Sequence, residues 1–174
     1  METALFTERF FYFCTMEKEF SSTVKIRFAD CDPIGHLNNV KYLEYMLNAR
    51  EDHVEQNYGF TYEQYTRETG CTWVTIQNEI AYLKEVRYNS TVEITSKTIA
   101  VNNMTSVVEL LMRDENGIVH AVFWLTVIYF NMKTRKAEMM SDESLEEFSK
   151  FLVDIDHKTF KERVAFLRSQ NKIK

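Results

Sequence analysis

The spacing of apolar and polar residues changes twice along this chain. Residues 23–28 alternate between the two kinds, which predicts a strand with one buried face. From Asn38 to Asn57 the apolar residues recur at helical spacing, and Asn38 suits the N-cap because its side chain accepts from a first-turn amide. The stripe predicted to face the core is Val40, Leu43, Leu47 and Val54, widened by Tyr42, Met46 and Ala49.

After Gly70 the period returns to two. Alternating segments begin near residues 74, 91 and 104, and Asp114 to Gly117 contains the Asn-Gly pair that favours a hairpin turn. Residues 119–130 are apolar at nearly every position, which predicts a central strand covered on both faces. Short helices are predicted over 62–68 and 141–152, and a further charged helix over 157–174.

This order of elements predicts a single α+β domain. Consecutive hairpins make the sheet largely antiparallel, and the one long helix must lie on a sheet face, so the sheet wraps around a central helix. We divide the chain into an N-terminal extension over 1–20, the domain over 21–156, and a charged C-terminal helix or tail over 157–174. A sheet of this kind leaves an edge strand exposed, which favours a homodimer or homotetramer.

Composition and charge exclude several classes of protein. The net charge of −5 argues against a nucleic-acid binder that neutralises phosphates. The longest apolar run is too short to cross a bilayer, and the N-terminus lacks the basic and apolar regions of a secretory signal. The three cysteines are odd in number and lack metal-ligand spacing, so a reducing cytoplasm is the predicted compartment.

The segment from Arg27 to Tyr42 reads RFADCDPIGHLNNVKY. It strongly resembles the strand–loop–helix motif of hotdog-fold acyl-CoA thioesterases, especially the 4-hydroxybenzoyl-CoA thioesterase family. The resemblance implies one hotdog domain that hydrolyses an acyl thioester, usually of coenzyme A, without a metal or other cofactor. It also implies that Asp32 is the catalytic aspartate and that Gly35 lets the backbone approach the thioester. Asn39 stands where one branch of the family carries a histidine.

The same segment is similar to the motif of acyl-ACP thioesterases. Asp32, His36 and the run from Asn38 to Tyr42 match that motif, whereas Ile34 replaces its catalytic asparagine. Those enzymes commonly use two hotdog repeats, and this chain has room for one. The acyl carrier therefore stays open between coenzyme A and ACP, and a non-catalytic module that binds an acyl group is a third alternative.

The chemistry of thioester hydrolysis agrees with this assignment. Asp32 could deprotonate water or attack the carbonyl directly, and amides near residues 36–39 lie at the positive end of the predicted helix, where an oxyanion would be stabilised. Lys84 and Arg87, or the basic turn at 133–136, would lie near the phosphates of coenzyme A. The predicted catalytic residues are Asp32, His36 and Asn39, and the predicted substrate-binding residues are Gly35, Asn38, Lys84 and Arg87.

Other chemistry-bearing residues have simpler interpretations. Asp30 is predicted to be structural and Cys31 an inert thiol at a strand end. A metal site built from Asp30, Asp32 and His36 lacks a distant ligand. Glu44 matches the helix glutamate of other hotdog enzymes, but it lies on the polar stripe with Lys41 and Asn48, which predicts a solvated face. The remaining histidines, His53, His120 and His157, have no partner in the sequence pattern.

Overall fold

The computed structural model describes residues 17–173. Residues 1–16, most of the predicted extension, and residue 174 lie outside the described residues. The elements, in chain order, are β1 (Glu19–Lys25), η1 (Phe28–Asp30), α1 (Asn39–Tyr58), α2 (Tyr62–Thr69), β2 (Cys71–Tyr82), β3 (Thr91–Val101), β4 (Thr105–Arg113), β5 (Val119–Asn131), β6 (Lys136–Ala137), α3 (Asp142–Ser149) and α4 (Phe160–Ile173).

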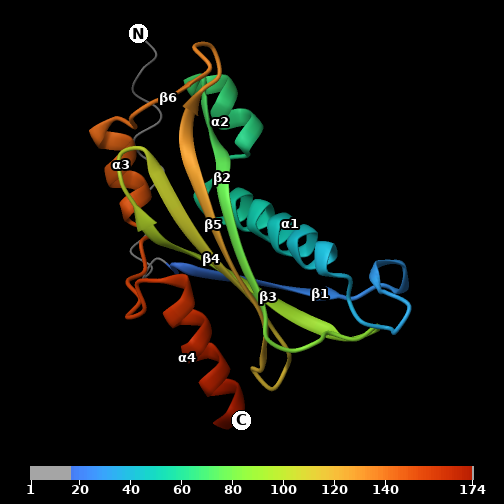
Figure 1. The fold of residues 1–174 in the computed structure, drawn as a ribbon. Helices are drawn as coiled ribbons and strands as arrows, with labels where there is room; N and C mark the ends of the chain where they lie inside the picture. The colour runs from blue at the N-terminus through green and yellow to red at the C-terminus, as the bar shows by residue number, and fades with distance from the viewer. Residues whose placement is uncertain (1–16, 174) are drawn as a thin grey trace.

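The strands form one antiparallel sheet in the order β1-β3-β4-β5-β2, with β6 paired to β5. The sheet curves around α1. The C-terminal helix, α4, lies on the opposite face of the sheet from α1 (Figure 1). The predicted fold class, a largely antiparallel sheet wrapped around one long helix with a C-terminal helix, is confirmed. Among the described residues, no helix is long and apolar enough to cross a membrane.

The long helix begins where the sequence predicts. Asn38 is the N-cap, and its Oδ1 accepts a hydrogen bond from the Val40 amide at 3.1 Å. The buried face, however, is rotated from the predicted stripe and consists of Tyr42, Met46, Ala49, Arg50, His53 and Val54. The prediction for Val40 and Leu47 is wrong, since they are 67% and 38% exposed. The helix has apolar residues on two sides, and only one side packs on the sheet.

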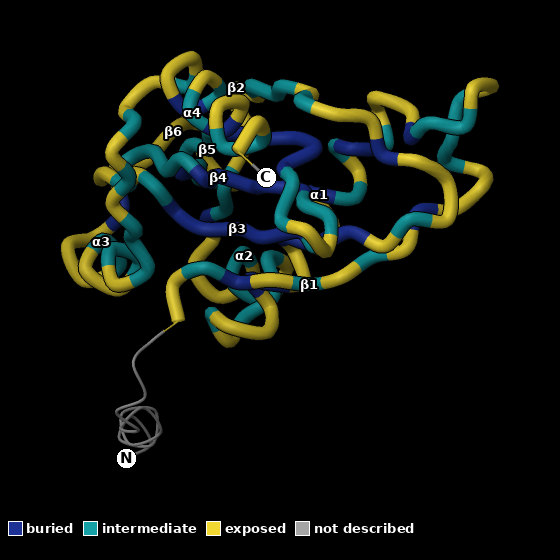
Figure 2. The backbone as a smooth tube through the Cα atoms, turned by 90° about the horizontal axis from the view of Figure 1, so that it is seen from below, coloured by how far each residue is buried: buried dark blue, intermediate teal, exposed yellow. Residues whose placement is uncertain are grey.

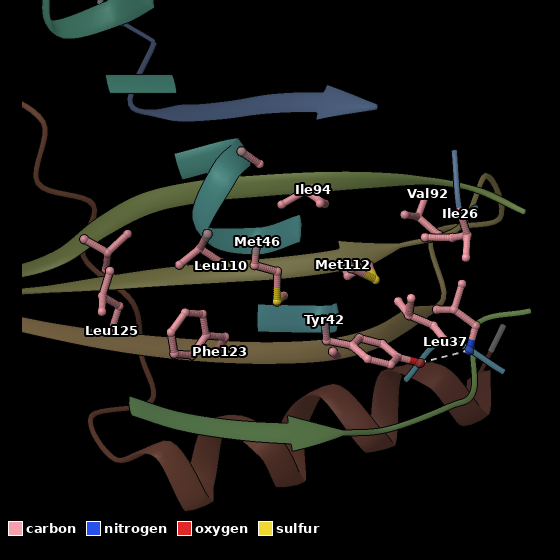
Figure 3. Close-up of a cluster of buried hydrophobic side chains, with 14 residues drawn as sticks. Ile26, Leu37, Tyr42, Met46, Val92, Ile94, Leu110, Met112, Phe123 and Leu125 are labelled. Atoms are coloured by element: carbon pink, nitrogen blue, oxygen red, sulfur yellow. Dashed lines mark hydrogen bonds between the residues drawn. The ribbon is translucent and has the colours of Figure 1, made fainter. Parts of the chain in front are cut away.

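The main core lies between α1 and the sheet. Met46 projects from the helix among Leu110, Met112 and Phe123 of the central strands, and the Tyr42 ring points toward Leu37 (Figure 3). Figure 2 shows long stretches of buried backbone along the middle strands, where β3 and β4 are labelled. Burial of this apolar surface supplies the main driving force for holding α1 on the sheet.

The opposite face of the sheet is covered by α4. Leu167 of α4 packs with Leu111, Val122 and Trp124 in a second apolar cluster. The prediction that β5 is covered on both faces is therefore confirmed, and the predicted charged C-terminal segment is a helix docked on the sheet over Phe160–Ile173.

The remaining elements agree with prediction apart from their ends. The Asp114 side chain accepts from the Asn116 and Ile118 amides in the predicted hairpin turn. The helices predicted over 62–68 and 141–152 are α2 and α3. The strand predicted over 23–28 begins four residues earlier and ends at Lys25, and the chain turns into η1 at Phe28.

Candidate active site

The loop between η1 and α1 holds Asp32 in a fixed conformation. Its Oδ1 accepts hydrogen bonds from the Ile34 amide at 3.0 Å and from the His36 amide at 2.9 Å. The Gly35 amide donates to the Asp32 carbonyl at 3.0 Å, and Gly35 has a φ of 81°, which residues with a Cβ rarely adopt. Among the described residues, Asp32 Oδ2 has no hydrogen-bond partner, so one carboxylate oxygen is anchored and the other is available.

The amides at the start of α1 are mostly paired, contrary to the prediction that those near 36–39 are free. The His36 amide donates to Asp32, the Leu37 amide to the Val86 carbonyl at 2.8 Å, and the Asn38 amide to the Asp30 carbonyl at 2.9 Å. Within residues 17–173, the Asn39 amide is the one of these four without a partner. As the first residue of α1, it lies at the positive end of the helix dipole.

A polar cleft of about 360 Å³ lies beside this loop. Four of the predicted site residues, Asp32, His36, Asn39 and Lys84, line it together. The other predicted residues, Gly35, Asn38 and Arg87, are absent from the lining: Gly35 shapes the turn, Asn38 caps α1, and Arg87 is described below.

Sequence reasoning missed the far wall of the cleft. Tyr82, at the end of β2, donates a hydrogen bond to the Asn39 carbonyl at 3.0 Å. Its ring meets that of Tyr42 edge-on at 5.1 Å between centroids, and Tyr42 Oη accepts from the Val86 amide at 3.0 Å (Figure 3). Burial raises the pKa of both phenols, so both stay protonated near neutral pH. Their separation of 40 residues in sequence left no local signal for this contact.

The segment after β2 brings charged residues to the cleft. The backbone of Arg87 pairs with that of His36 in an isolated bridge, and its guanidinium lies 3.7 Å from the Glu85 carboxylate. A hydrogen bond from its own backbone amide, aided by the Arg87 charge, lowers the pKa of Glu85. The basic turn at 133–136 follows the opposite end of β5, so within one protomer it lies far from Lys84.

The side chains with simpler interpretations have structural partners. Asp30 accepts from the Tyr45 hydroxyl at 2.6 Å and pairs with Lys41 at 3.3 Å, and the Tyr45 hydrogen bond lowers the pKa of Asp30. Burial and the neighbouring aspartates raise the pKa of Cys31, which disfavours a thiolate nucleophile. Glu44 is exposed and pairs with Lys41, as the polar stripe predicts.

The other histidines are also accounted for. His53 is buried between Ser96 and Ser22, and His120 contacts the Glu85 carbonyl and the Asp114 carboxylate. His157 stacks on Phe166. Across residues 17–173, no group of three or more histidine, cysteine or acidic side chains is placed to hold a metal ion.

A sequence profile of the thioesterase-like superfamily matches residues 26–148, which include the Asp32 loop, α1 and the whole sheet from β2 to β6. The chain belongs to this superfamily. The predicted resemblance to hotdog thioesterases and the prediction that the chain is a thioesterase are thereby confirmed. The match does not single out the 4-hydroxybenzoyl-CoA branch.

Individual relatives agree with this assignment. The chain is 25% identical to the long-chain acyl-CoA thioesterase FadM of Escherichia coli, over 74% of this chain and 96% of FadM. The crystal structure of the probable thioesterase YbaW from Escherichia coli has a TM-score of 0.68 at 24% identity and covers 76% of this chain and 98% of its own. The 12:0-ACP thioesterase of Umbellularia californica has a TM-score of 0.74 at 20% identity, over 84% of this chain and 55% of its own.

Proposed function

We propose that this thioesterase hydrolyses acyl-CoA to a free acid and coenzyme A, with Asp32 performing the chemical step. The observation that carries the proposal is the asymmetry of the Asp32 carboxylate, whose Oδ1 is held by two backbone amides while Oδ2 is unpaired among the described residues. A base must be positioned without being saturated by partners, and this carboxylate meets both conditions.

Two routes are compatible with this carboxylate. As a general base, Asp32 takes a proton from a water molecule that attacks the thioester carbonyl, and the proton then passes to the leaving thiolate of coenzyme A. As a nucleophile, Asp32 forms an anhydride and releases the thiolate, and water then hydrolyses the anhydride. In both routes we assign the oxyanion to the unpaired amide of Asn39, a residue that lines the cleft together with His36.

The choice of carrier rests on chain length and charge. The chain covers 96% of FadM, named as an acyl-CoA thioesterase, but 55% of the Umbellularia enzyme, named as an ACP thioesterase. Lys84 in the cleft supplies a positive charge for the phosphates of coenzyme A. An acyl-ACP substrate is the alternative. Acyl-CoA and acyl-ACP esters of matched chain length, compared by thiol release, decide between the two carriers.

The decisive experiment replaces the carboxylate with an amide of the same shape. Asp32→Asn should lower kcat by at least about 100-fold, the low end for a positioned base, while the melting temperature stays within a few degrees. Glu44→Gln is the matched control on the polar face of α1, and we expect less than about a threefold change. Full turnover by Asp32→Asn with loss in Glu44→Gln would assign the chemistry to the helix glutamate. Absence of any hydrolysis by the wild type would favour the non-catalytic module.

We also propose that the protein is a homodimer joined at β2. This strand of 12 residues is an edge of the sheet, paired only with β5 among the described strands, and its Val74 and Ile76 are 39% and 55% exposed. Val40 and Leu47 on the uncovered side of α1 add further exposed apolar surface. A long apolar edge of this kind favours pairing with a second copy. Light scattering at micromolar concentration should give twice the 20.7 kDa chain mass, and a persistent monomer would contradict this.

The free thiols of Cys31 and Cys71 fit a reducing compartment. We therefore retain the cytoplasm as the proposed location.

A further inference from the structure

A second cavity lies under the C-terminal half of α1, at the other end of the helix from Asp32. Its volume is about 60 Å³, enough for roughly four water-sized groups. It is lined by aromatic side chains from α1, α2, α3, β2 and the α1–α2 loop, by aliphatic and hydroxyl side chains of the sheet, and by one charged residue, Arg50. A mostly apolar lining with very few polar groups is typical of sites for small organic ligands, and a cavity of this volume admits about four non-hydrogen atoms of such a ligand.

Arg50 is the unusual feature of this cavity. It is only 7% exposed, its Nη1 lies 3.4 Å from Ser96 Oγ, and its Nη2 donates to the Tyr58 hydroxyl at 3.2 Å. Its Nε is buried and has no hydrogen-bond partner. Within residues 17–173, no carboxylate lies within ion-pair distance of this guanidinium. A buried charge without a counter-charge and a buried donor without an acceptor both oppose folding, so their presence here requires an explanation.

The aromatic walls supply the other half of a recognition site. The Tyr58 ring lies 5.1 Å from the Arg50 guanidinium carbon and stacks on Phe151 at 3.9 Å. Trp73 and Phe148 meet edge-on at 4.8 Å on another side of the cavity. The cavity therefore offers apolar surface for part of a ligand and, at one point, the positive charge of Arg50, whose unpaired Nε itself lies buried beneath that surface. The group that complements this point is a carboxylate, because the planar guanidinium binds its two oxygens in parallel.

We propose that this cavity is a carboxylate-binding subsite in which Arg50 pairs with the acid group at the end of an aliphatic ligand, and the cavity holds that group with the carbon atoms next to it. The carboxylate comes from one of two sources. It is the far end of the acyl group, in a CoA monothioester of a dicarboxylic acid, or it is a free carboxylic acid such as the product of hydrolysis. Both ligands follow from the proposed function, since one is a substrate and the other a product of hydrolysis. The binding site is argued from the cavity alone.

The length of α1 between the two sites limits which dicarboxylic acid could reach from one to the other. Arg50 comes eleven positions after Asn39, which places the two about 16 Å apart along the helix axis. An extended chain advances about 1.2 Å per bond, so a diacid of roughly a dozen bonds spans that distance. Met46 and Phe123 are fully buried between the two ends, so a ligand joining them must displace these side chains. A free acid needs no such displacement.

Calorimetric titration of the full chain with propionate, whose five non-hydrogen atoms are close to what the cavity admits, tests the subsite directly. The acid should bind at least about tenfold more tightly than propionamide, because a charge-assisted pair is lost in the amide. Arg50→Gln should remove this preference, and Arg50→Lys, which keeps the charge without the planar fork, should retain part of it. Arg67→Gln, which removes an exposed arginine of α2, should bind like the wild type.

Because Arg50 variants can fail to fold, Ser106→Leu provides an independent test. It keeps Arg50 and fills the cavity from β4, so it should weaken binding of the acid by at least tenfold, with folding checked by thermal melting. Equal binding of acid and amide by the wild type, or wild-type affinity for the acid in a folded Arg50→Gln or Ser106→Leu protein, would overturn the proposal.

Kinetics then separate the two sources. CoA monothioesters of octanedioic and dodecanedioic acid are compared with octanoyl-CoA and dodecanoyl-CoA. If the subsite binds the far end of the acyl group, the diacid ester has a higher kcat/KM than the monoacid ester of the same length. The ratio of the two kcat/KM values should then fall at least tenfold in Arg50→Gln. If the ligand is a free acid, that ratio should stay the same while acid binding is lost in the calorimeter. Failure to hydrolyse any ester would refute the proposed function and leave the binding result standing.

Discussion

Each face of the sheet buries one arginine, and the two differ in whether a carboxylate pairs with the guanidinium. On the α4 face, Arg163 donates from Nε and Nη2 to the two oxygens of Glu109, both at 2.7 Å, and Glu109 also accepts from Trp124 and lies 3.6 Å from Lys97. On the α1 face, Arg50 has only hydroxyl partners among the described residues and an unpaired Nε.

The difference distinguishes a buried arginine that only stabilises the fold from one that can still pair with a ligand. A buried ion pair with every donor and acceptor satisfied fixes one arrangement of α4 on the sheet and leaves nothing for a ligand. A buried guanidinium that lacks its carboxylate gains most when a ligand supplies one. The α4 face should therefore respond to mutation through stability, and the α1 face mainly through catalysis and binding.

The largest expected effect is on the α4 face. Glu109→Gln leaves Arg163 buried without its carboxylate, whereas Lys97 keeps its pair with Glu19 at 2.9 Å, so the free energy of unfolding should fall by about 3–5 kcal/mol, as for one broken buried pair. The kcat of the folded fraction should remain unchanged because Glu109 lies across the sheet from Asp32. Urea denaturation measures the loss, and Glu115→Gln in the exposed hairpin turn is the control, with an expected change below about 0.5 kcal/mol. A loss of catalysis without a loss of stability would reverse the comparison.

The same comparison explains what the sequence could predict. The Asp32 loop, the Asn38 cap and the Asp114 turn depend on neighbours within a few residues, so local patterns located them. The buried face of α1 depends on which side meets the sheet, and its apolar residues on both sides, Val40 and Met46 among them, did not distinguish the two.

Contacts between distant segments were beyond local patterns. The pairing of Arg163 with Glu109 joins residues 54 apart, and the hydrogen bond from Tyr82 to Asn39 joins residues 43 apart. The sequence showed the C-terminal helix as charged, but only the fold shows that one of its charges is a buried anchor.

A smaller effect is expected at the cleft on the α1 side. Lys84→Glu should raise KM for acyl-CoA by about tenfold with little change in kcat, because Lys84 lines the cleft and its proposed contact with the CoA phosphates is equal in the ground and transition states. Arg87→Glu should raise KM less, since its side chain is exposed and lies beside Glu85. Lys161→Glu, at an exposed position of α4 on the other face of the sheet, is the control. An unchanged KM in Lys84→Glu would remove that residue from the substrate site.

The stability of Arg50 variants sharpens the contrast with Arg163. Arg50→Met replaces an unpaired buried charge with an apolar side chain of similar length, so the free energy of unfolding should stay the same or rise by up to about 1 kcal/mol. Arg163→Met should instead destabilise by several kcal/mol, because Glu109 is left buried without its partner. Equal losses in the two variants would make Arg50 a structural residue like Arg163.

The smallest effect is a pH dependence on the α1 face. Burial, aided by the nearby Arg50 charge, lowers the pKa of His53 below its ordinary value near 6.5, while the Asp52 carboxylate opposes this. The unfolded chain therefore takes up a proton at His53 more readily than the folded chain does. Stability from this group is fully present well above pH 6.5 and declines as the pH falls through 6.5 toward the lowered pKa of the folded state.

His53→Gln should flatten that decline, because the amide keeps a hydrogen-bonding group near Ser96 and Ser22 but does not titrate. Arg50→Met should reduce the slope without abolishing it, since the burial of His53 remains when the neighbouring charge is removed. The measurement is the free energy of unfolding in urea at pH 7 and pH 5.5 for the three proteins. Identical slopes in wild type and His53→Gln would show that His53 does not contribute to the acid sensitivity of this face.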